Sequence, residues 1–198
     1  MISIAELRVS SKAWSYLQSA HKEFSAGHLR ESSKAADRAL QIDPSCAVAF
    51  SMKAFIELAM KNPIAAAEDA ARAASLDPYN AEAFVALAMA YNSVDDYPRS
   101  QEAARQALSI RPDSWQARLE LGKSLYGQGS FDLALNEVNA LGKDFPDVHL
   151  VRGNILMRLG RSHEGAAEFS TFVQEAPHDP RAGTIRGIIA YVAATPTS

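Results

Sequence analysis

The feature that most restricts how this chain can fold is a proline that returns every 34 residues. Three of these prolines end similar five-residue phrases, at residues 40–44, 74–78 and 108–112. Proline cannot continue a helix, and it disfavours helical geometry in the residue before it. The spacing therefore predicts a helix that stops at each proline and another that begins just beyond it. The five positions are Pro44, Pro78, Pro112, Pro146 and Pro180.

A second break lies between successive prolines, at residues 26–28, 61–63, 95–98 and 128–130. Glycine ends a helix in two of these breaks, while Asn, Asp or Ser is suited to cap the next helix. Pro63 and Pro98 suit the first turn of a helix, where no backbone amide partner is lost. Each unit is therefore predicted to be a helix, a short turn, a second helix and a proline stop.

Small and large residues also return in phase with the prolines. The middle of each first helix carries a small residue, at Ala20, Ala54, Ala88 and Gly122. Four places earlier stand Tyr16, Phe50 and Phe84, with Arg118 departing from the pattern. The second helices carry small residues at Ser32, Ala66, Ser100 and Ala134, and again at Ala39, Ala73 and Ala107, where Leu141 departs. In this pattern the chain resembles the tetratricopeptide repeat, a family of 34-residue helix-turn-helix units.

The resemblance implies an all-α fold, a right-handed superhelical α-solenoid of antiparallel helix pairs. The fifth unit matches best in a register three residues shorter than the proline spacing, through Gly153, Gly165, Phe169 and Phe172. Pro177 then ends the fifth repeat, and Pro180 begins a final helix. The expected division is an arm or linker at 1–10, repeats over 11–178 (about 11–46, 47–80, 81–114, 115–145 and 146–178), a capping helix at 179–194 and a tail at 195–198.

The two ends lie outside the repeats. Over residues 180–194, four apolar side chains recur at helical spacing and form one face. This face is expected to cover Phe169, Phe172 and Val173 of the last repeat, because an end repeat has no neighbour to bury it. The alternative is a helix that binds a partner or dimerises. The apolar residues within 2–9 alternate as in an extended strand rather than a helix. This segment is expected to be a linker or to lie along the solenoid's own surface. Ser10 or Ser11 then caps the first helix. The four apolar residues are Ile185, Ile188, Ile189 and Val192.

The resemblance also indicates where a ligand would sit, because in this family the first helices line a concave groove. Carried onto this sequence, the groove positions are expected to be exposed and include several apolar side chains, and an exposed apolar stripe usually marks a binding surface. We expect it to take an apolar or amphipathic peptide. The alternative is that some of these residues pack between helices, above all in the first repeat, which also presents Trp14. The predicted site residues are Leu17, His21, Phe55, Leu58, Val85, Met89, Asn92, Leu119, Lys123, Tyr126 and Asn154.

The sequence lacks the motifs that are typical of several classes of function. The formal net charge is -3, and no run of basic residues offers a footprint for nucleic acid. Cys46 is the only cysteine, so no internal disulfide forms, and a lone cysteine usually packs as a small hydrophobe. The five histidines show no zinc-protease spacing. We therefore expect no catalytic residue, no metal site and no cofactor.

The sequence predicts neither a membrane-spanning segment nor a signal peptide in this chain. No apolar run is long enough to enter a membrane, and the first residues do not form a signal peptide. The compartment stays open, cytoplasmic by default and periplasmic if the chain comes from an exported protein. The leading hypothesis is a scaffold or adaptor that binds another protein or peptide. The alternatives are a self-associating solenoid and a regulatory repeat domain of a larger bacterial protein.

Overall fold

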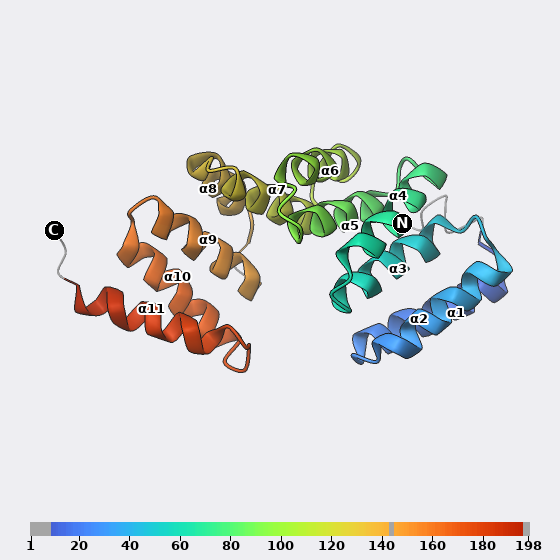
Figure 1. Cartoon of the computed structure of the whole chain (residues 1–198), viewed down its shortest axis with the longest axis horizontal. Helices are drawn as coiled ribbons and strands as arrows, with labels where there is room; N and C mark the ends of the chain where they lie inside the picture. The colour runs from blue at the N-terminus through green and yellow to red at the C-terminus, as the bar shows by residue number, and fades with distance from the viewer. Residues whose placement is uncertain (1–8, 143–144, 196–198) are drawn as a thin grey trace. The chain divides into compact units, whose positions relative to one another are not determined.

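The computed structural model describes residues 9–142 and 145–195, and over these residues it contains eleven helices and no strand (Figure 1). The bounds are α1 Ser11–Ser25, α2 Leu29–Ile42, α3 Ala47–Ala59, α4 Pro63–Leu76, α5 Ala81–Asn92, α6 Tyr97–Ile110, α7 Trp115–Gly127, α8 Phe131–Asn139, α9 Pro146–Arg158, α10 Ser162–Glu175 and α11 Ala182–Ala194. Eleven helices fit about five helix pairs followed by one terminal helix. The predicted strand at residues 2–9 lies almost wholly outside the described part.

The chain forms two compact units, divided between Glu120 and Leu121 within α7. In the first unit, α1 packs with α2, α3 with α4, and α5 with α6. In the second, α9 packs with α8 and α10, and α11 packs on α10. The odd-numbered helices up to α9 are called the first helices, and their even-numbered partners the second helices. The predicted all-α fold of helix pairs is confirmed.

The turn inside each pair is marked by a residue in the left-handed conformation. Three are glycines and two carry side chains, at φ values of 77°, 64°, 59°, 78° and 75° in chain order. The first four are 34 residues apart, whereas the last follows after 31. The interval is shorter where α8 has 9 residues, against 14 in α2, α4 and α6. The five residues are Gly27, Lys61, Asp95, Gly129 and Gly160.

Not every proline of the 34-residue series ends a unit in the same way. Pro44, Pro78 and Pro112 lie between helices, as predicted. Pro146 instead occupies the first turn of α9, so the prediction that a helix begins only beyond this proline was wrong. A proline is well suited to this position, because its missing amide would have no partner in the helix. The terminal helix begins at Ala182, two residues after Pro180.

Small residues allow the helices of a pair to approach closely. Ala20 and Ala88 are fully buried. Their carbonyl oxygens accept hydrogen bonds from the buried hydroxyls of Ser32, at 2.7 Å, and Ser100, at 3.0 Å. A Cβ atom added to Gly122 would lie 2.5 Å from Val138 Cγ2, so no larger residue fits there without a shift of Val138. The repeated small residues therefore determine the spacing within each pair.

The two ends of the described chain are covered differently. Ser10 is the N-cap of α1, and its side-chain oxygen accepts a hydrogen bond from the Ala13 amide at 3.2 Å. At the other end, Ile185 of α11 is buried against Phe169 and Phe172, with Val173, Ile188 and Ile189 packed around them. The terminal helix thus covers the apolar face of α10, as predicted. Cys46 is buried in the cluster beneath α1, also as predicted.

Candidate functional site

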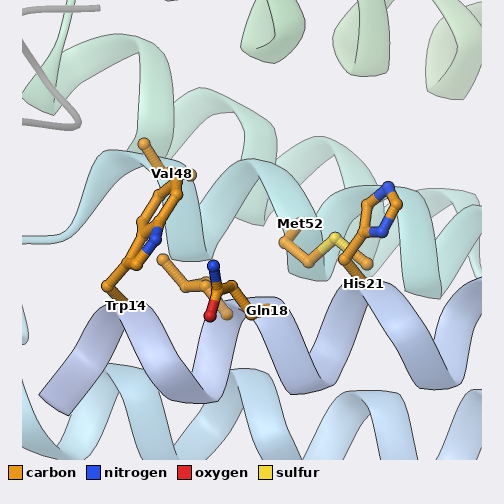
Figure 2. A pocket seen from close by; sticks show the side chains of 6 residues that line it. Trp14, Gln18, His21, Val48 and Met52 are labelled. Carbon is orange, nitrogen blue, oxygen red and sulfur yellow. The ribbon is translucent and has the colours of Figure 1, made fainter. Parts of the chain in front are cut away.

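A hollow of about 410 Å³ lies between α1 and α3, the first helices of the first two pairs. The side chains from α1 stand at spacings of three and four residues, which place them on one face of the helix. Figure 2 shows Trp14 reaching toward Val48 at one end, Met52 and His21 at the other, and Gln18 between them. The six lining residues are Trp14, Leu17, Gln18, His21, Val48 and Met52.

The lining of the hollow is apolar at its base and polar at its edge. Leu17 is 5% exposed and belongs to a core cluster against which Trp14, Val48 and Met52 pack. Gln18 and His21 are exposed. None of the six residues is an Asp, Glu, Lys or Arg, so the hollow offers apolar contact with two hydrogen-bonding groups beside it.

The expectation that the predicted groove residues are exposed was wrong for three of them. Leu17 is 5% exposed, Val85 1% and Leu119 3%. Leu17 packs with Ala49 of α3. Val85 belongs to a core cluster with Ala107 of α6 and Ala117 of α7. The three side chains therefore face the interior of the repeats rather than solvent, and they contribute to the core beneath the surface of the first helices.

Other predicted residues of the first unit are only partly open to solvent. Phe55 and Met89 are partly buried and pack against the Val85 cluster, and Leu58 is also partly buried. Asn92 donates hydrogen bonds from Nδ2 to the backbone oxygen and to Oε2 of Glu120, at 3.0 and 2.7 Å. These contacts give the side chains structural roles. His21 is the exposed member of the predicted set in this unit, and it lines the hollow.

Three predicted residues fall in the second unit. Lys123 and Tyr126 lie on α7 and Asn154 on α9, and each is partly buried. The ring of Tyr126 lies 5.6 Å from that of Phe131, measured between centroids. These three positions remain predicted site residues.

Gln18 and Met52 line the hollow, although the repeat register did not single them out. Gln18 directly follows the buried Leu17, and Met52 directly follows the buried Ser51. The spacing of the α1 residues, at i, i+3, i+4 and i+7, is the signal that identifies Gln18, because these positions share one helical face. Met52 stands 34 residues after Gln18 and occupies the equivalent place on α3.

A buried ionic cluster in the second unit was also missing from the predictions. His149 Nδ1 lies 2.6 Å from Glu168 Oε2, and Arg152 Nη1 lies 3.1 Å from the same oxygen. Arg152 Nη2 donates to the backbone oxygen of Val138 at 3.1 Å. His149 and Arg152 are 3% and 6% exposed. The cluster therefore joins α8, α9 and α10 and does not present a reactive group to a substrate.

Three further properties of the described residues concern metal binding, the single cysteine and membrane crossing. Within the described ranges, no group of three or more His, Cys, Asp and Glu side chains is placed to hold a metal ion. Burial raises the pKa of the Cys46 thiol, which disfavours the nucleophilic thiolate. No helix among residues 9–142 and 145–195 combines the length and the apolar character needed to cross a bilayer.

Comparison with known proteins agrees with the helix-pair architecture. Residues 85–147 match the family model described as tetratricopeptide repeat. No curated protein matches the chain. Among solved structures, a thermophilic tetratricopeptide-repeat protein of Thermus thermophilus superposes with a TM-score of 0.76 at 18% identity, covering 92% of this chain and 100% of that one.

Two other similar structures concern peptide binding. YrrB, described as a tetratricopeptide-repeat protein with an unusual peptide-binding site, gives a TM-score of 0.61 at 16% identity, over 94% of this chain and 100% of that chain. The first tetratricopeptide-repeat domain of Spaghetti (RPAP3), bound to an HSP90 peptide, gives 0.58 at 20% identity, over 61% and 95%. At these identities the likeness concerns the fold alone.

Proposed function

We propose that this chain, which is a tetratricopeptide-repeat protein, is a non-catalytic scaffold that binds an apolar or amphipathic segment of another protein. The observation that carries the proposal is the hollow between α1 and α3, with its apolar base and a lining that contains no Asp, Glu, Lys or Arg. Its volume of about 410 Å³ lies within the range of roughly 300–1,000 Å³ that ligand pockets occupy. The hollow is therefore large enough to enclose apolar side chains of a peptide.

The residue types in the hollow suit this role. Trp14 supplies a large, stiff surface, while Met52 adapts its shape to different side chains. Gln18 and His21 stand at the edge, where they can bond to the backbone of a peptide whose apolar side chains point inward. Two of the similar structures, one bound to a peptide and one described as having a peptide-binding site, support the same kind of partner.

The proposed contact surface extends along further first helices. In the first unit it includes Phe55, Leu58, Met89 and Asn92, which are partly buried and thus offer part of their side chains. In the second unit, taken by itself, Lys123, Tyr126 and Asn154 are further proposed contact residues. The hollow at α1 and α3 is the place where the apolar contact would be deepest, and it is where the test is directed.

The test begins with peptides selected on the full chain from a phage-displayed library of random 12-residue sequences. The fluorescence of Trp14 reports binding in a Trp115→Phe background, because the chain has no third tryptophan. We expect peptides with apolar side chains that shift the emission of Trp14. The double variant Gln18→Glu/His21→Glu, which changes exposed residues only, should weaken them at least tenfold by placing charge beside the apolar base.

The matched control is Gln41→Glu, on the exposed side of α2. It should leave the dissociation constant within twofold of the wild-type value. Selected peptides that leave the emission of Trp14 unchanged, or that bind the double variant as well as the wild type, would rule out this hollow as the binding site. Light scattering at several concentrations checks the self-association alternative, which a monomer at all concentrations excludes.

A further inference from the structure

A second hollow lies in the first unit on different helices. It has a volume of about 360 Å³ and is formed by α4, by the end of α5 with the turn that follows it, and by the start of α6. None of its lining residues belongs to α1 or α3. Its walls include Ile64, Ala67, Ala71, Tyr91, Val94 and Arg99.

Two large apolar side chains in this hollow are open to solvent. Ile64 is 70% exposed and Val94 is 48% exposed, and they come from the two sides of the hollow. Beside them, Ala67 and Ala71 are too small to fill the space along α4. A contiguous exposed apolar surface of this kind is typical of an interaction site, whereas scattered single residues are not.

In the helix pairs on either side of the second, polar residues stand at the positions of Ala67 and Ala71. The residues equivalent to Ala67 are Ser33 in the first pair and Gln101 in the third, and those equivalent to Ala71 are Asp37 and Arg105. The residue equivalent to Ile64 in the first pair is Arg30. The helix pair itself therefore accepts longer polar side chains at these positions. The repeat architecture does not require small apolar residues at these positions, so the open wall that they form on α4 is available for binding.

Of the two charged side chains that line this hollow, one is already paired within the protein and the other is not. The guanidinium of Arg99 pairs with the carboxylate of Asp96, with Nε 2.6 Å from Oδ2, and its Cζ lies 4.6 Å from the centroid of the Tyr91 ring. Arg99 is thus already paired and held against an aromatic face. Glu68, which also lines the hollow, is exposed and has no ion-pair partner among the described residues. The charge left for a ligand is negative.

We propose that this hollow is a second docking site, which binds a short segment of a partner protein that carries two apolar side chains next to a Lys or Arg. The apolar side chains lie against Ile64 and Val94, in the space that Ala67 and Ala71 leave open. The basic side chain pairs with Glu68. From Ile64 to Ala71 the wall runs along seven residues of helix, a rise of about 10 Å, which is long enough to take two apolar side chains. The site is separate from the hollow at α1 and α3.

The test uses the full chain and a phage-displayed library of random 12-residue peptides. Peptides are kept if they bind the wild type but not the variant Ala67→Gln/Ala71→Arg, whose residues are those that the third helix pair carries at these positions. We expect a consensus of two apolar residues and a Lys or Arg. Synthetic peptides with this consensus should bind the variant at least tenfold more weakly than the wild type.

A charge exchange tests the ionic part. Glu68→Lys changes an exposed side chain, so folding is retained, and it should weaken the consensus peptide at least threefold. The same peptide with its basic residue replaced by Glu should bind Glu68→Lys better than it binds the wild type. Two matched controls should bind the consensus peptide like the wild type: Ser33→Gln at the equivalent place on α2, and Gln18→Glu/His21→Glu at the other hollow.

Several outcomes would overturn the proposal. One is that the library yields no peptide that binds the wild type but not Ala67→Gln/Ala71→Arg, while circular dichroism shows both proteins folded. An acidic consensus would contradict the role of Glu68. Loss of binding in Gln18→Glu/His21→Glu alone would place the peptides in the hollow at α1 and α3. Self-association of the wild type that the Ala67→Gln/Ala71→Arg variant lacks would make a second copy of the chain the occupant.

Discussion

At the scale of single residues, two turns inside the helix pairs hold side chains in the left-handed conformation. Lys61 has a φ of 64° and Asp95 a φ of 59°, where the equivalent positions of other pairs carry Gly27 and Gly129. This conformation brings the Cβ of an ordinary residue close to a carbonyl oxygen, at a cost of roughly 1–2 kcal/mol, which glycine avoids. Glycine in turn has more freedom to lose on folding.

The exchange of glycine and lysine between two of these turns gives the first prediction. Lys61→Gly should raise the free energy of unfolding of the first unit by about 0.5 kcal/mol, because relief of the backbone strain exceeds the loss of entropy. Gly129→Lys should lower that of the second unit by about 1 kcal/mol. A Cβ at Gly129 would meet no atom within 4 Å, so the change reports backbone conformation alone. Urea unfolding measures both, and destabilisation by Lys61→Gly would contradict the argument.

The buried cluster around Glu168 gives the second prediction. Glu168→Gln removes the negative charge that both Arg152 and His149 contact. The positive charge of the Arg152 guanidinium then loses its paired carboxylate, and its Nε already has no hydrogen-bond partner within the described structure. We expect the free energy of unfolding of the second unit to fall by about 2–3 kcal/mol. Glu164→Gln, which breaks an exposed pair with Arg161 in the same helix pair, should have a much smaller effect in the same urea experiment. Equal losses would show that burial does not strengthen the cluster.

A carboxylate at the start of α11 gives a pH dependence, which is the third prediction. The Arg181 guanidinium and backbone amide lower the pKa of Asp179 to about 2, whereas an unfolded Asp titrates near about 3.9. A lowered pKa in the folded state means that the ionised carboxylate contributes stability that is complete above about pH 4 and is lost as the pH falls to about 2.

Asp179→Asn removes this titration. The variant should be less stable than the wild type at pH 7, and the difference between their free energies of unfolding should shrink between about pH 4 and pH 2. Thermal unfolding of both proteins over this pH range measures the difference and cancels the other carboxylates. A difference that stays constant down to pH 2 would show that Arg181 does not act through the charge of Asp179.

At the scale of the helix, α11 covers the last helix pair, and this leads to the fourth prediction. Ile185 is 6% exposed against Phe169 and Phe172, so Ile185→Ala should destabilise this contact by about 2–4 kcal/mol. Because each repeat contacts only its neighbours, the loss should appear in hydrogen exchange as faster exchange in α10 and α11, with α1–α6 unchanged. Thr184→Ala, on the exposed side of α11, is the control and should change little.

The helix pairs could be predicted from the sequence because their signals are local. A proline or glycine stops a helix whatever packs against it, and the first three pairs begin and end near the predicted residues. Pro146 was misassigned because proline is equally at home just after one helix and in the first turn of the next. Which of the two occurs depends on where α8 ends, and that is determined by packing rather than by a local signal.

The candidate site was harder to predict for the same reason. The repeat register places Leu17 and Val85 on the first helices, but their burial depends on residues more than thirty positions away, such as Ala49 for Leu17. The hollow at α4 was not predicted at all, because an alanine-rich helix has the composition of a core element. The hollow can be recognised only in the folded structure, because Tyr91, Val94 and Arg99 of the third helix pair form the side opposite α4.

At the scale of the whole molecule, the two compact units carry different features. Both hollows belong to the first unit, whereas the ionic cluster and the terminal helix belong to the second. A ligand stabilises whatever must be folded to bind it, by about 2.7 kcal/mol when its free concentration is 100 times the dissociation constant. A peptide in either hollow should therefore stabilise the first unit directly and the second only if the two unfold together.

Hydrogen exchange measured by mass spectrometry distinguishes these cases and gives the fifth prediction. With a selected peptide at 100 times its dissociation constant, amides of α1–α6 that exchange through unfolding of the first unit should slow about 100-fold. Amides of α9–α11 should change less than threefold, because α11 and the Glu168 cluster stabilise that unit independently. Gln18→Glu/His21→Glu should abolish the effect of a peptide that binds between α1 and α3. Equal slowing in α9–α11 would instead mean that the division within α7 does not separate two cooperative units, since the binding energy would then reach residues that the peptide does not touch.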